Sequence, residues 1–79
     1  MGEFRDWFKK MLFNLDDGNL NEALYCSDMA LYSAERDVDE TSQKELAEVY
    51  LARGKILNLL GRGDEAGYCF RIIEELKTC

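Results

Sequence analysis

The sequence predicts an all-α protein in which four antiparallel helices form two helical hairpins. The chain contains no proline and few β-branched residues, a composition that suits helices better than sheet. The nonamers GNLNEALYC, beginning at Gly18, and GRGDEAGYC, beginning at Gly61, share Gly, Glu, Ala, Tyr and Cys in the same places. Because such a coincidence is rare in so short a chain, we infer that one hairpin occurs twice.

Length and composition limit the classes of protein that the chain can represent. With 79 residues we expect a single domain over 1–79, with a core that is marginal for its size. A net charge of −6 argues against binding to nucleic acid or to an anionic membrane. We find no secretion signal and no apolar run near the roughly 20 residues of a membrane span. Three cysteines without paired spacing favour a reducing compartment, so we expect a cytoplasmic protein.

The first expected hairpin covers about residues 3–36. Apolar residues recur at helical spacing over 3–15 and form one broad face: Phe4, Trp7, Phe8, Met11, Leu12 and Leu15. Gly18 is suited to end this helix in a left-handed conformation, and Asn19 is a natural N-cap for the next helix. The apolar stripe of that second helix is expected to contain Leu20, Ala23, Leu24, Ser27, Ala30, Leu31 and Ala34.

The second expected hairpin covers about residues 42–77. Ser42 opens a Ser-x-x-Glu capping box, which predicts a third helix from there to about Leu60. Its main apolar face is Leu46, Val49, Tyr50, Ile56, Leu57 and Leu60. A fourth helix is expected from about Asp64 to Lys77, with these residues turned inward: Ala66, Cys69, Phe70, Ile73 and Leu76. Short loops make neighbouring helices antiparallel.

The relation between the two units extends beyond the nonamers. An offset of 43 residues aligns Trp7 with Tyr50, and Ala23 with Ala66. The two alanines occupy the positions where the helices of each hairpin are expected to approach most closely. Upstream of the turns, an offset of 42 residues pairs Phe8 with Tyr50 instead, so one extra residue in the first turn is an alternative.

The second unit resembles the tetratricopeptide repeat family. Within AEVYLARGKILNLLGRGDEAGYCFRIIEEL, the matching positions are Tyr50, Gly54, Gly61, Ala66 and Phe70. The first unit matches less closely, at Trp7, Gly18, Ala23 and Ala30. Its departures are Met11 in place of the glycine at the helix crossing and Ser27 in place of the aromatic residue. In addition, Lys10 and Arg53 stand where the family usually has leucine, both closing prolines are missing, and the 43-residue spacing exceeds the family repeat of about 34.

The resemblance implies a right-handed α-α superhelix or a compact bundle that serves as a non-enzymatic protein-interaction module. Such repeats bind a peptide or a partner helix in a groove lined by the first helix of each hairpin. Mapped onto this chain, the groove residues are Arg5, Phe8, Lys9, Leu12, Leu51, Lys55 and Asn58. Some members of the family clamp a carboxylate with lysine and asparagine, for which only Lys9, Lys55 and Asn58 are available here.

Two alternatives stay open. Two hairpins are few for a stable stack, and the first helix carries many large apolar residues, so either the fourth helix folds over it or a second copy covers it in a homodimeric bundle. The second alternative is a calcium-binding helix-loop-helix at 37–48. That segment has ligand-type residues at calcium-loop spacing, but Ser42 occupies the position that requires glycine. The candidate ligands are Asp37, Asp39, Thr41, Glu45 and Glu48.

The sequence contains no recognisable catalytic constellation. It has no histidine, and Cys26 and Cys69 lie on the inward sides of their helices without a base to activate them. We therefore expect neither an enzyme, nor a cofactor, nor a metal site, and a protein or peptide as the partner. The acidic residues concentrate over 14–50, which is either a solvated surface or a docking surface for a basic protein.

Overall fold

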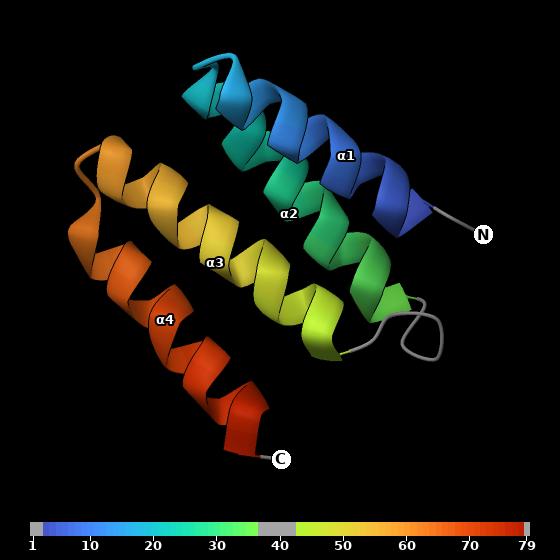
Figure 1. Ribbon diagram of the computed structural model, residues 1–79, viewed down its shortest axis with the longest axis vertical. Helices are drawn as coiled ribbons and strands as arrows, with labels where there is room; N and C mark the ends of the chain where they lie inside the picture. The colour runs from blue at the N-terminus through green and yellow to red at the C-terminus, as the bar shows by residue number, and fades with distance from the viewer. Residues whose placement is uncertain (1–2, 37–42, 79) are drawn as a thin grey trace.

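The computed structural model describes residues 3–36 and 43–78, and this part of the chain forms four α-helices (Figure 1). They are α1 (Glu3–Asp16), α2 (Leu20–Arg36), α3 (Gln43–Leu59) and α4 (Gly63–Thr78). The all-α prediction is confirmed, with helix ends within one residue of those expected, apart from the N-cap at Ser42, which lies outside the described residues.

The two hairpins stand side by side and do not close into a bundle. α1 packs on α2, α3 packs on α4, and the hairpins meet chiefly through α2 and α3. Successive helices alternate in direction, so α1 runs parallel to α3 in Figure 1. Among the described helices α4 packs only on α3, so the fourth helix does not fold over the first. The result is a flat molecule of 33 × 27 × 16 Å.

The turns of the two hairpins are closed by the same pair of backbone hydrogen bonds. Gly18 and Gly61 have φ angles of 83° and 78°, in the left-handed region that glycine adopts without strain. The Gly18 amide donates to the Leu15 carbonyl at 3.2 Å, and the Gly61 amide donates to the Asn58 carbonyl at 3.0 Å. The next amide along the chain donates a 2.8 Å bond in both turns. An extra residue in the first turn is therefore wrong, and the offset of 43 residues holds through both turns.

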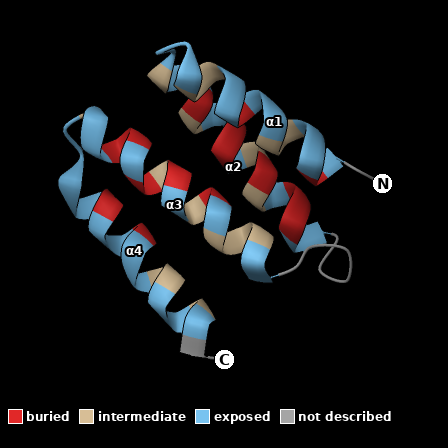
Figure 2. Ribbon diagram, in the orientation of Figure 1, coloured by how far each residue is buried: buried red, intermediate tan, exposed pale blue. Residues whose placement is uncertain are grey.

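The main core cluster centres on α2, between Phe4 and Met11 of α1 and the facing side of α3, and a smaller cluster lies between α3 and α4 (Figure 2). The predicted stripes of α2 and α3 are confirmed, since all their members are buried or half-buried. Two predicted core residues differ. Leu12 is 44% exposed, because it lies at the edge of the apolar arc of α1, and Phe70 is 36% exposed, because its ring covers α3 from outside.

At the equivalent helix crossing, each hairpin combines one large and one small residue, but on opposite helices. In the second hairpin, the Phe70 ring lies over Gly54 so closely that a Cβ there would be 2.6 Å from Phe70 Cε1. The equivalent positions of the first hairpin hold Ser27 and Met11, both with no exposed surface. The large residue is thus on the second helix of one hairpin and on the first helix of the other. Because close packing constrains the total volume, each change compensates for the other.

Candidate functional site

One ion pair identifies the side of α1 that is turned toward α3. Arg5 Nε lies 3.6 Å from a carboxylate oxygen of Glu45 on α3. Lys9 and Leu12 follow Arg5 at i+4 and i+7, so they share its side of the helix. Both are exposed. Phe8 is half-buried beside them and stacks on Phe4 with a ring separation of 6.0 Å.

The outer side of α3 continues this surface. Leu51, Lys55 and Asn58 are exposed and follow one another at i, i+4 and i+7. Leu59 is exposed as well. We use the name α1/α3 face for the surface formed by Arg5, Phe8, Lys9, Leu12, Leu51, Lys55, Asn58 and Leu59. Within 3–36 and 43–78, the exposed leucines are Leu12 at 44%, Leu51 at 45% and Leu59 at 65%, and all lie on this face.

The α1/α3 face is locally basic on an acidic molecule. Lys9, Lys44 and Lys55 are exposed along it, and they outnumber the exposed acids on the same side, Asp16 of α1 and Glu48 of α3. The charge of Arg5 is offset by its pairing with Glu45. Because the whole chain carries a net charge of −6, the negative charge concentrates on other surfaces. An acidic or backbone-carbonyl group of a partner would therefore be favoured here.

The outer side of α4 lacks the two leucines that α2 presents to α3. α2 meets α3 through Leu24, Ser27, Asp28 and Leu31. At the offset of 43 residues, the equivalent positions of α4 are Gly67, Phe70, Arg71 and Glu74. All of these are exposed, and the one apolar member, Phe70, is turned onto Gly54. The outer side of α4 is consequently suited to water, and not to receiving a further hairpin.

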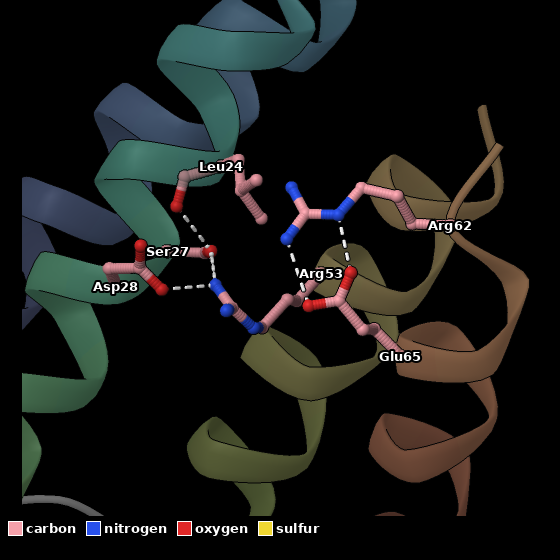
Figure 3. A network of polar contacts seen from close by, with 6 residues as sticks. All are labelled: Leu24, Ser27, Asp28, Arg53, Arg62 and Glu65. Carbon is pink, nitrogen blue, oxygen red and sulfur yellow. Dashed lines mark hydrogen bonds and ion pairs between the residues drawn. The ribbon is translucent and has the colours of Figure 1, made fainter. Parts of the chain in front are cut away.

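Arg53 joins the two hairpins through a polar network (Figure 3). Its Nη1 donates to Ser27 Oγ at 2.7 Å and also to the carboxylate of Asp28. The Ser27 hydroxyl donates in turn to the Leu24 carbonyl at 2.7 Å, so this fully buried side chain is satisfied. Hydrogen bonds from a guanidinium are stronger than neutral ones, so we infer that Arg53 stabilises the contact between α2 and α3.

Sequence reasoning missed this role of Arg53. The available signal was a basic residue at the same place in both units, Lys10 and Arg53. In the first hairpin the equivalent residue is Lys10, and its Nζ lies 4.8 Å from the centre of the Trp7 ring. A second arginine, Arg62, pairs with Glu65 in the first turn of α4, and its hydrogen bond holds the pKa of that carboxyl below the ordinary value.

Two open hollows lie on a different side of α3, between α2 and α4. Their volumes are about 490 Å³ and 360 Å³. The larger one is lined by Leu31, Tyr50, Arg53, Leu57, Asp64, Glu65, Tyr68 and Cys69. The smaller one is lined by Leu31, Ala34, Glu35, Gln43, Leu46, Tyr50 and Leu76. Sequence reasoning did not identify this surface, because it depends on the gap that α2 and α4 leave over α3.

The described cysteines are free and buried. Burial raises the pKa of both the Cys26 and the Cys69 thiol, which disfavours the reactive thiolate. Across 3–36 and 43–78, no group of three or more Cys, Asp or Glu residues is placed to hold a metal ion. The predicted calcium ligands within 37–42 lie outside the described residues. Glu48, the last predicted ligand, is exposed on α3.

Comparison with known proteins yields no match to a family model, to a curated protein or to a solved structure. None of the described helices combines the length and the apolar character that crossing a lipid bilayer would require.

Proposed function

We propose that the protein is a non-enzymatic protein-interaction module of tetratricopeptide-like type, which binds a peptide or a partner helix on its α1/α3 face. The observation that carries this proposal is the gathering of the exposed leucines Leu12, Leu51 and Leu59 on one face. A single exposed leucine is ordinary, whereas several together beside polar groups are typical of a binding surface. Lys55 and Asn58 lie next to Leu51 on the same side of α3, where they would orient a bound backbone or an acidic side chain.

The repeated architecture supports the tetratricopeptide-like part of the proposal. The two turns have the same pair of closing hydrogen bonds, and the first helices of the two hairpins run parallel to each other in Figure 1. Buried alanines, Ala23 and Ala66, occupy the same place in both second helices. In a protein of this type we expect the residues that bind a ligand on the parallel first helices, α1 and α3.

A peptide selection tests the proposal. Peptides that bind the parent protein would be selected from a random displayed library, and their affinity measured by fluorescence anisotropy. The double variant Leu51→Ser with Lys55→Glu should weaken binding at least tenfold, and its unfolding free energy should stay within about 1 kcal/mol of the parent, as for most surface changes. The control is Tyr32→Ser with Arg36→Glu on α2, which removes an exposed aromatic side chain and reverses the charge of the base at i+4, away from the α1/α3 face, and should leave the affinity unchanged.

The outcomes separate this proposal from its competitors. Equal binding by both double variants would place the site away from the α1/α3 face. A large loss of stability in Leu51→Ser with Lys55→Glu would show that Leu51 belongs to the core. The same exposed leucines favour a second candidate function, a homodimeric structural bundle. Light scattering that shows a parent dimer and a monomeric Leu51→Ser, Lys55→Glu variant would favour the homodimer.

A further inference from the structure

The two hollows between α2 and α4 adjoin each other along α3. Both are lined by Leu31 of α2 and by Tyr50 of α3. Among the described helices, α2 and α4 each pack on α3 and not on each other, so α3 is the floor of the groove and they are its walls. We call this surface the α2/α4 groove. Its floor from Gln43 to Leu57 spans roughly 21 Å at 1.5 Å per residue, which is about four turns of a helix.

Apolar side chains from three helices line the α2/α4 groove. Leu31 comes from α2, Leu46 and Tyr50 come from α3, and Leu76 comes from α4. All are half-buried, so each still presents apolar surface to the groove. All four line the smaller hollow, and Leu31 and Tyr50 line the larger hollow as well, where Leu57 joins them. This arrangement suits an elongated apolar ligand.

The rims of the groove are acidic. Glu35 stands on the α2 side and Asp64 on the α4 side, both exposed. The one arginine that lines the groove, Arg53, is bound to Asp28 and does not offset them. Glu65 is likewise occupied by Arg62. The net charge along both rims is therefore negative, as is the net charge of the whole molecule.

We propose that the α2/α4 groove binds an amphipathic helix that has a leucine-rich stripe flanked by basic residues. A helix placed over α3 between two walls packs on three neighbours, as in a four-helix bundle. Its apolar stripe would meet Leu31, Tyr50 and Leu76, and its basic flanks would meet Glu35 and Asp64 on opposite rims. This interaction is independent of the proposed function, which uses another side of α3 and favours an acidic partner.

The probe is a synthetic helical peptide of roughly 16 residues, or about four turns. It carries leucine at i, i+4, i+7 and i+11 and lysine on both flanks. One control peptide has glutamate in place of every lysine, and another has the same composition with the leucines spread around the helix. Titration of ¹⁵N-labelled protein should shift amide signals of groove residues, such as Leu31, Tyr50 and Leu76, with the lysine peptide and with neither control.

Charge variants locate the binding site. Glu35→Lys with Asp64→Lys should lower the affinity for the lysine peptide at least tenfold, because both rims then repel it. Glu22→Lys with Glu74→Lys applies the same charge change to the same two helices outside the groove, and should lower it less than threefold. If the reversed charges disturb folding, the neutral pair Glu35→Gln with Asp64→Asn should give an intermediate loss.

Several results would overturn this proposal. Equal losses in the two lysine variants would indicate non-specific attraction, and equal binding of the spread-leucine peptide would exclude a helix face. Amide signal shifts confined to residues of the α1/α3 face would place the peptide-binding site on that face and not in the α2/α4 groove. A parent dimer that Glu35→Lys with Asp64→Lys dissociates would show that a second copy fills the groove. The Leu51→Ser, Lys55→Glu variant should bind the probe like the parent, so the two proposals can fail separately.

Discussion

Replacing Gly54 with alanine tests the closest helix contact in the second hairpin. The added Cβ would lie 2.6 Å from Cε1 and 2.8 Å from Cζ of Phe70. Carbon atoms in contact are normally separated by about 3.5–4 Å, so the ring has to move by about 1 Å. Because Phe70 is 36% exposed, the ring can swing outward, but it then loses contact with α3.

The change in unfolding free energy that Gly54→Ala causes is the sum of two opposing effects. Full burial of a phenylalanine stabilises a protein by about 1.5–3 kcal/mol, so losing roughly half of that burial costs about 1 kcal/mol. Alanine is favoured over glycine in a helix by about 0.5–1 kcal/mol. The two nearly cancel, so Gly54→Ala should leave the unfolding free energy almost unchanged. Gly67→Ala, on α4, meets no atom within 4 Å and should stabilise by the full helix preference.

The assay is urea unfolding followed by Trp7 fluorescence and far-UV circular dichroism, with linear extrapolation of the free energy. The expected result is that Gly67→Ala is more stable than Gly54→Ala by about 1 kcal/mol. A double-mutant cycle isolates the cause. In a Phe70→Ala background the obstructing ring is gone, so both substitutions should stabilise equally. If Gly54→Ala stabilises as much as Gly67→Ala in the parent, the ring does not lie over Gly54 and the proposed volume exchange is wrong.

Three further predictions concern the polar network, the thiols and calcium. Arg53→Ala should lower the unfolding free energy, measured in urea, by about 1–2 kcal/mol, because charge-assisted hydrogen bonds between the hairpins are lost. Lys10→Ala should lower it by at most about 0.5–1 kcal/mol. Equal effects of the two substitutions would contradict a bridging role of Arg53. Burial raises the pKa of Cys26 and Cys69 above the ordinary 9.0, so the unfolded chain loses these protons first. The unfolding free energy should therefore fall as the pH rises above 9, less steeply in Cys69→Ala, and a flat profile would argue against this cause. Millimolar calcium should leave the melting temperature unchanged, and a calcium-dependent rise that Glu48→Gln abolishes would restore the helix-loop-helix alternative.

The sequence by itself determined the helices, the turns and the relation between the two units. These features depend on local interactions: helical spacing of apolar residues, an N-cap at Asn19, and glycines at 18 and 61 that adopt positive φ without strain. The residues of the α1/α3 face were accessible to the same reasoning, since Leu51 and Lys55 lie off the apolar stripe of α3. An alternative register in the first turn was excluded only by its hydrogen bonds.

The tertiary structure decided what depends on contacts between helices distant in the sequence. In the sequence, Met11 in place of Gly54 and Ser27 in place of Phe70 read as two unrelated departures from the repeat. Only the packed hairpins show that each crossing combines one large and one small residue, so that the total volume is similar. The bonds from Arg53 to α2 connect residues about 25 positions apart, beyond the reach of helical periodicity. The α2/α4 groove likewise exists only because α2 and α4 both pack on α3 and not on each other.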